Sequence, residues 1–127
     1  MRLRIVLLLL LLLLAVAVAG CGVGRATDEE KVSKAATAYL RALASGDTAT
    51  ACAQLTPQAR GEGCDRTMKE RLSSLDSDAL KDAADGSMDI DVDANRATAG
   101  LSEPEGARFR LVKTGDEWRI DSGYTLD

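Results

Sequence analysis

The sequence predicts an α+β domain in which helices come first and an antiparallel sheet follows. Apolar residues recur at helical spacing from Val32 onward, and after Gly86 the pattern changes to alternation of apolar and charged residues. A run of helices followed by a run of strands is typical of α+β folds, in which the sheet packs on the helices. The chain of 127 residues is long enough for one domain, which we assign to residues 28–127.

The first and clearest helix begins behind the capping box Thr27-Asp-Glu-Glu30, where a hydroxyl and a carboxylate three residues later satisfy free backbone N–H groups. Its apolar stripe has helical spacing and ends before Gly46. The stripe consists of Val32, Ala35, Ala36, Tyr39, Leu40 and Leu43.

Shorter helices are predicted next. Asp47 is placed to cap a helix that continues through Leu55, and Thr56-Pro57 is an N-cap and first-turn pair that begins a short turn. For residues 76–86 the pattern is ambiguous, and we expect only a marginal helical turn or two. The helix before that segment is expected to carry on one side Cys64, Met68, Leu72 and Leu75.

Four strands are predicted after Gly86. In the first, 88–93, apolar residues alternate with aspartates, and Ala94-Asn95 makes a turn into the second strand, 96–101. After a loop at 102–106, "ARFRLVK" and "EWRID" form a hairpin around Thr114-Gly115-Asp116. One face of this hairpin is expected to hold Phe109, Leu111, Trp118 and Ile120, and the other Arg108, Arg110, Glu117 and Arg119.

The N-terminus has the features of an export signal. Arg2 and Arg4 precede 15 uninterrupted apolar residues at 5–19, which is shorter than the roughly 20 that a membrane-spanning helix needs. Val18-Ala19-Gly20-Cys21 resembles the lipobox of bacterial lipoproteins. This resemblance implies cleavage of a signal peptide at 1–20, a diacylglyceryl thioether on Cys21, and a short tether at 21–27. We therefore expect an extracytoplasmic protein attached to the cell membrane by the lipid on Cys21.

The charge of the chain limits its partners. The 16 basic side chains include Arg2 and Arg4, so 14 stand against 20 acidic ones after cleavage, a net charge of −6. No basic patch is present, and nucleic acid is therefore not expected as a partner. Anionic lipid headgroups would repel such a domain, so the lipid on Cys21 would have to anchor the protein without electrostatic help.

The remaining cysteines, Cys52 and Cys64, are predicted to form a disulfide, because exported proteins fold in an oxidising compartment. A zinc site is not expected, since the chain has no histidine and only two cysteines remain. A redox pair would show Cys-x-x-Cys spacing, which is absent.

No motif for a metal, a cofactor or nucleophilic catalysis is found. "DIDVDAN" begins like a calcium-binding EF-hand loop, but Ala94 and Gly100 stand where the required Gly and Glu should be. A catalytic triad is excluded because the chain has no histidine, and no glycine-rich loop joins a strand to a helix. We expect neither a metal nor a cofactor.

At "AYLRALASGDTATACAQLTPQAR" and "FRLVKTGDEWRI" the sequence resembles the nuclear-transport-factor-2-like superfamily. The resemblance spans most of residues 28–122 and implies a cone, in which a curved antiparallel sheet encloses the helices. It also implies a pocket at the open end, for which Tyr39, Phe109 and Trp118 are the candidate lining residues.

The superfamily includes ketosteroid-isomerase-like enzymes, in which a tyrosine on the first helix donates a hydrogen bond to a developing oxyanion. Tyr39 matches that position. The general-base aspartate would be expected near Gly63, where only the neighbouring Asp65 is found, and the second oxyanion donor expected in "FRLV" is missing. The sequence therefore favours a non-catalytic module that binds a small apolar ligand or another envelope protein, with an isomerase or dehydratase using Tyr39 as the alternative.

Overall fold

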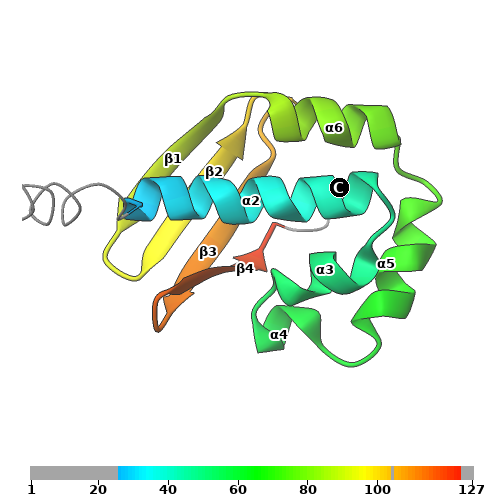
Figure 1. The fold of residues 1–127 in the computed structure, drawn as a ribbon, viewed down its shortest axis with the longest axis horizontal. Helices are drawn as coiled ribbons and strands as arrows, with labels where there is room; N and C mark the ends of the chain where they lie inside the picture. The colour runs from blue at the N-terminus through cyan, green and yellow to red at the C-terminus, as the bar shows by residue number, and fades with distance from the viewer. Residues whose placement is uncertain (1–25, 104, 124–127) are drawn as a thin grey trace, which may run out of the picture.

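The computed structural model describes residues 26–103 and 105–123, and it confirms an α+β fold with helices first and strands second (Figure 1). The helices of this part are α2 (Asp28–Ala44), α3 (Thr48–Ala53), α4 (Pro57–Arg60), α5 (Cys64–Leu72) and α6 (Ser77–Asp85). The strands are β1 (Met88–Asp93), β2 (Arg96–Leu101), β3 (Arg108–Thr114) and β4 (Glu117–Ser122).

The strands form one antiparallel sheet in the order β1-β2-β3-β4, so each strand pairs with the next along the chain. β1 and β4 are therefore the edge strands. The free edge of β4 is partly covered, because the N–H of Thr56 donates to the carbonyl of Ile120 at 2.9 Å and the N–H of Ile120 donates to the carbonyl of Gln54 at 2.8 Å. No described strand pairs with the outer edge of β1.

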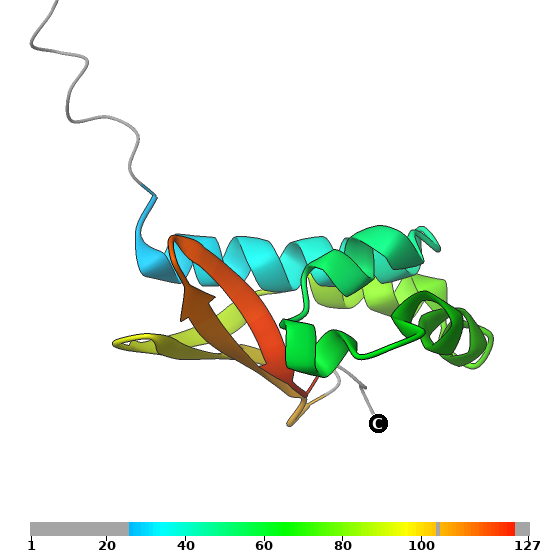
Figure 2. The same ribbon diagram turned by 90° about the horizontal axis from the view of Figure 1, so that it is seen from below.

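Helix α2 lies across one face of the sheet, with α6 beside its second half (Figures 1 and 2). Thr27 is the N-cap of α2 as predicted, and its hydroxyl accepts a hydrogen bond from the N–H of Glu30 at 3.2 Å, which is one half of the predicted capping box. The predicted apolar stripe faces the sheet and is buried along its length. The core between the helices and the sheet includes Val32, Tyr39, Leu40, Leu55, Phe109, Leu111 and Ile120, each at most 1% exposed.

The predicted helix boundaries differ from the structure at three places. α3 ends at Ala53 rather than Leu55, because Leu55 forms a parallel bridge with Ile120 of β4. α5 ends at Leu72, before Leu75. The ambiguous segment 76–86 is a full helix of nine residues, α6, which buries one apolar side against α2. Tertiary packing thus extends a helix whose own sequence signal is weak.

The two faces of the β3–β4 hairpin separate as predicted. Phe109, Leu111, Trp118 and Ile120 are buried, whereas Arg108, Arg110 and Glu117 are exposed. The register adds one residue to the inner face that was not predicted there. Trp118 pairs with Lys113, and Ile120 pairs with Leu111. The side chain of Lys113 therefore lies beside Trp118, with its Nζ 6.0 Å from the indole centroid.

Replacing Gly123 with alanine is expected to destabilise the fold by about 2 kcal/mol. Gly123 has φ +80°, and a Cβ atom there would lie 2.0 Å from the carbonyl oxygen of Arg108, so the end of β4 would have to move. Urea denaturation of both proteins measures the loss. Gly115→Ala is the matched control, because Gly115 also has positive φ (+64°) but has nothing within 4 Å of such a Cβ. A loss at Gly123 no larger than the loss at Gly115 would contradict the steric explanation.

Candidate functional site

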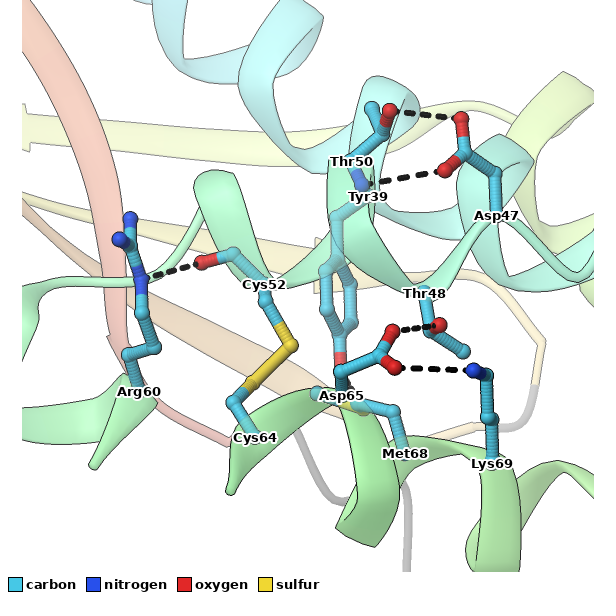
Figure 3. Close-up of a disulfide and its surroundings, with 10 residues drawn as sticks. All are labelled: Tyr39, Asp47, Thr48, Thr50, Cys52, Arg60, Cys64, Asp65, Met68 and Lys69. Atoms are coloured by element: carbon cyan, nitrogen blue, oxygen red, sulfur yellow. Dashed lines mark hydrogen bonds and ion pairs between the residues drawn. A yellow bond between two sulfur atoms is a disulfide. The ribbon is translucent and has the colours of Figure 1, made fainter. Parts of the chain in front are cut away.

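Two of the three candidate pocket residues lie together inside the core. The Tyr39 and Phe109 rings make an edge-to-face contact, with centroids 5.6 Å apart and an interplanar angle of 87°. Both side chains are fully buried. The Tyr39 hydroxyl lies 3.8 Å from Sδ of Met68 as a hydrogen-bond donor, and Figure 3 shows the ring reaching from α2 toward α5. Neither Tyr39 nor Phe109 lines the larger cavities of the described part of the chain.

The third candidate, Trp118, lines an open cavity of about 530 Å³ between α2 and β4. It also joins the sheet to the first residue of α2. Its Nε1 donates to Oδ1 of Asp28 at 3.2 Å, and Nζ of Lys113 donates to the same oxygen at 3.2 Å. These two donors, the indole first, lower the pKa of the Asp28 carboxyl below its ordinary value. Figure 2 shows the turn of the β3–β4 hairpin at the end of the domain where α2 begins. This cluster fixes the beginning of the domain to its last two strands.

The cluster of Asp28, Lys113 and Trp118, called the Asp28 cluster below, is expected to lose its stabilising effect in acid. Because the folded-state pKa of Asp28 lies below the ordinary value of 3.8, its stabilisation is complete above that value and disappears as the pH falls through the folded-state pKa. The free energy of unfolding should therefore be higher for the wild type than for Asp28→Asn at neutral pH, and the gap should close in acid. Urea titrations followed by fluorescence of Trp118, the single tryptophan, measure the gap. A gap unchanged at about pH 2.5 would contradict this assignment.

The predicted disulfide between Cys52 and Cys64 is present and joins α3 to the start of α5 (Figure 3). Their Cα atoms are 6.1 Å apart. Nε of Arg60 donates to the carbonyl of Cys52 at 3.0 Å, which ties the intervening α4 segment to the same place. The bridge therefore closes a compact unit at the end of the domain that lies away from the start of α2 (Figure 1).

Carboxylates near this bridge are engaged in local hydrogen bonds. Asp65 accepts from the buried Thr48 hydroxyl and pairs with Lys69 at 2.9 Å, so the Thr48 bond first and Lys69 second lower the pKa of the Asp65 carboxyl. Asp47 caps α3 through the hydroxyl and N–H of Thr50, and these bonds lower its pKa as well. These carboxyl groups are therefore held in the ionised form, which weakens them as proton acceptors.

A groove of about 780 Å³ separates α2 from the edge strand β1. Met88 and Ile90 of β1, both half-buried, form its apolar side together with Ala38 of α2. Its polar lining comes from α2 and consists of Glu29, Glu30, Ser33, Lys34, Thr37 and Arg41. The strand alternation that predicts Met88 and Ile90 on the inner face is confirmed, but the groove itself was not predicted, because it depends on where α2 crosses the sheet.

The aspartates of "DIDVDAN" lie on the other face of β1. Asp89, Asp91 and Asp93 are exposed, as alternation along a strand requires. Among the described residues, no three His, Cys, Asp or Glu side chains are grouped so that they could hold a metal ion.

The predictions for residues 1–20 and for Cys21 lie outside the described residues. Within residues 26–103 and 105–123, no helix is both long enough and apolar enough to cross a membrane. Comparisons with protein-family models, with curated proteins and with solved structures found no match for this chain.

Proposed function

We propose that this chain is a lipid-anchored module on the extracytoplasmic face of a bacterial cell membrane, where it binds another envelope protein without catalysing a reaction. The observation that carries the proposal is the groove between α2 and β1, which combines an apolar side with a polar side that carries charges of both signs. A protein partner can reach this groove from solvent. The interior around Tyr39 and Phe109 cannot take a ligand in the same way, because the protein's own side chains fill it. The second candidate function is binding of a small apolar ligand in the same groove.

The attachment rests on the lipobox resemblance at Cys21 together with the position of α2. Six residues separate Cys21 from Asp28, the first residue of α2, and span about 20 Å when extended. The Asp28 cluster fixes this end of α2 to the sheet. An anchor on Cys21 would therefore hold the start of α2 near the bilayer and keep the groove beside it close to the membrane surface.

We also propose that the domain is a small member of the nuclear-transport-factor-2-like superfamily. Support comes from the order of helices before strands and from the twisted antiparallel sheet against which the first helix packs (Figure 2). Four strands in an open sheet would make a shallow version of the cone. The superfamily fold does not by itself specify an activity, so the function depends on the groove.

The surroundings of Tyr39 support a non-catalytic role over the isomerase alternative. Its ring packs on Phe109, and its hydroxyl is directed at Met68 Sδ. A general base would need a raised pKa, whereas the shifted carboxyl groups of the described residues, Asp28, Asp47 and Asp65, all have lowered values.

Photo-crosslinking in intact cells tests the proposal. A photoreactive residue is placed at Thr37 in the groove of the full-length chain, and the matched control carries it at the exposed Glu62, outside the groove. We expect a discrete protein adduct from position 37 that is absent from position 62 and is lost with Cys21→Ser. No adduct from position 37, together with no apolar molecule found by native mass spectrometry of the purified chain, would contradict a binding function.

A further inference from the structure

The outer edge of β1 offers unpaired backbone groups next to the groove. The two-residue turn of the β1–β2 hairpin is flanked by Asp93 and Arg96, which pair with each other. Two further pairs along the hairpin are Asp91 with Thr98 and Asp89 with Gly100. Residues that close a two-residue turn exchange both backbone hydrogen bonds, and such pairs alternate along an antiparallel ladder. The N–H and C=O groups of Ile90 and Val92 therefore point away from β2, toward an edge that no described strand occupies.

A strand added at this edge would have two different sides. On the inner side its residues would enter the groove and meet Met88 and Ile90, which are half-buried and complete an apolar surface with Ala38. On the outer side they would stand beside Asp89 and Asp91, both exposed. Because side chains alternate along a strand, the segment that fits has apolar residues at every second position.

The charges on β1 determine which residues are favourable at the outer-side positions of the added strand. Asp89 and Asp91 face Gly100 and Thr98 on β2, and no ion pair of the described residues includes them. In the groove itself the charges balance, with Glu29 and Glu30 against Lys34 and Arg41, so the charge that selects the partner is that of Asp89 and Asp91. Lysine or arginine beside Asp89 and Asp91 would therefore be favourable as cross-strand pairs.

A second copy of β1 does not meet this requirement. Any pairing of two such strands that keeps Met88 and Ile90 on the groove side places aspartates beside aspartates on the other side, which is unfavourable. The aspartates thus oppose self-association at this edge. They leave it open to a chain of opposite charge.

We propose that the β1 edge and the adjoining groove bind an extended segment of a partner protein in which basic and apolar residues alternate, so that the segment becomes a fifth strand of the sheet. The backbone of Ile90 and Val92 supplies the main-chain hydrogen bonds, the groove accepts the apolar side chains, and Asp89 and Asp91 pair with the basic ones. This inference deepens the proposed function and rests on it, since it names the class of partner.

A synthetic peptide tests the inference on the full-length lipidated chain in non-ionic detergent. The probe is the end-blocked peptide Lys-Ile-Lys-Val-Lys-Ile-Lys, and its control has Glu in place of each Lys. Fluorescence anisotropy measures affinity, corrected for binding to empty micelles, and amide hydrogen exchange locates the contact. We expect binding of the basic peptide alone, weaker at high salt, with slowed exchange at the N–H groups of Ile90 and Val92.

Charge-reversal variants distinguish specific binding at the β1 edge from general electrostatic attraction between the basic peptide and the acidic protein. The double variant Asp89→Lys/Asp91→Lys should weaken binding of the basic peptide at least about tenfold, because like charges would then lie side by side. The matched control, Glu62→Lys/Glu70→Lys, makes the same change of net charge at exposed positions outside β1 and should leave the affinity unchanged. Circular dichroism verifies that both variants fold.

Three results would overturn the inference, namely no binding of the basic peptide, equal weakening by the two double variants, or unchanged exchange at Ile90 and Val92. Any of these results, obtained while position 37 still gives its adduct in cells, would reject the strand-addition mode and leave the binding function in place. Loss of the adduct as well would reject both.

Discussion

Phe109→Ala is expected to lower the free energy of unfolding by about 3–5 kcal/mol. Phe109 is the only phenylalanine of the chain, is fully buried, and packs edge-to-face on Tyr39. Few other large side chains are present to fill the space, since aromatic residues make up only 3% of the sequence. A cavity at this point would therefore remove a large share of the stability of a small domain, which is about 5–15 kcal/mol.

Urea denaturation followed by far-ultraviolet circular dichroism measures this loss. Val112→Ala is the control, because Val112 lies on the same strand but is only half-buried on the opposite face, and a loss well below that of Phe109→Ala is expected. Tyr39→Phe keeps the ring and its edge-to-face contact with Phe109, so it should cost less than Phe109→Ala. A loss at Phe109 as small as that at Val112 would contradict the central position of the aromatic pair.

Removal of the disulfide is expected to cost about 3 kcal/mol. The bridge joins residues twelve positions apart and restricts the unfolded chain over the segment that contains α4. Cys64 is at the first residue of α5, and Cys52 is buried in α3, so the bridge also holds two short helices that depend on packing. The variant Cys52→Ala/Cys64→Ala should therefore unfold at lower urea concentration than the wild type.

A reducing agent provides the control for this prediction. Dithiothreitol should destabilise the wild type by a similar amount and leave the double alanine variant unchanged. Equal stability of oxidised and reduced wild type would show that the bridge does not restrict the unfolded chain as proposed. Hydrogen exchange should place the largest local effect in α5, which packs mainly on α3 among the described elements.

The elements with strong local signals could be predicted from the sequence. Helix α2 has its N-cap Thr27, its apolar stripe and its terminating Gly46 within one continuous segment, and the structure has all three. The four strands follow alternation and turn residues, which are local as well. The pair Cys52 and Cys64 could also be predicted, because the third cysteine is assigned to the lipobox.

Features that depend on distant contacts could not be predicted in this way. The helix α6 has only Leu80, Ala83 and Ala84 to bury, and these become informative only when α2 is beside them. Asp28 and Trp118 are 90 positions apart, so nothing in either local sequence indicates their hydrogen bond. The groove has the same origin, because its two walls come from segments about 50 residues apart whose relative placement is set by the core.

The proposed attachment of a lipid to Cys21 is tested directly by one measurement. The full-length chain is produced in a bacterium, extracted from the membrane fraction and analysed by intact-mass and N-terminal peptide mass spectrometry. We expect residues 1–20 to be absent and the first residue to be Cys21 with a diacylglyceryl group on its sulfur. A Cys21 thiol without lipid, or a chain that keeps its leucine tract, would contradict it.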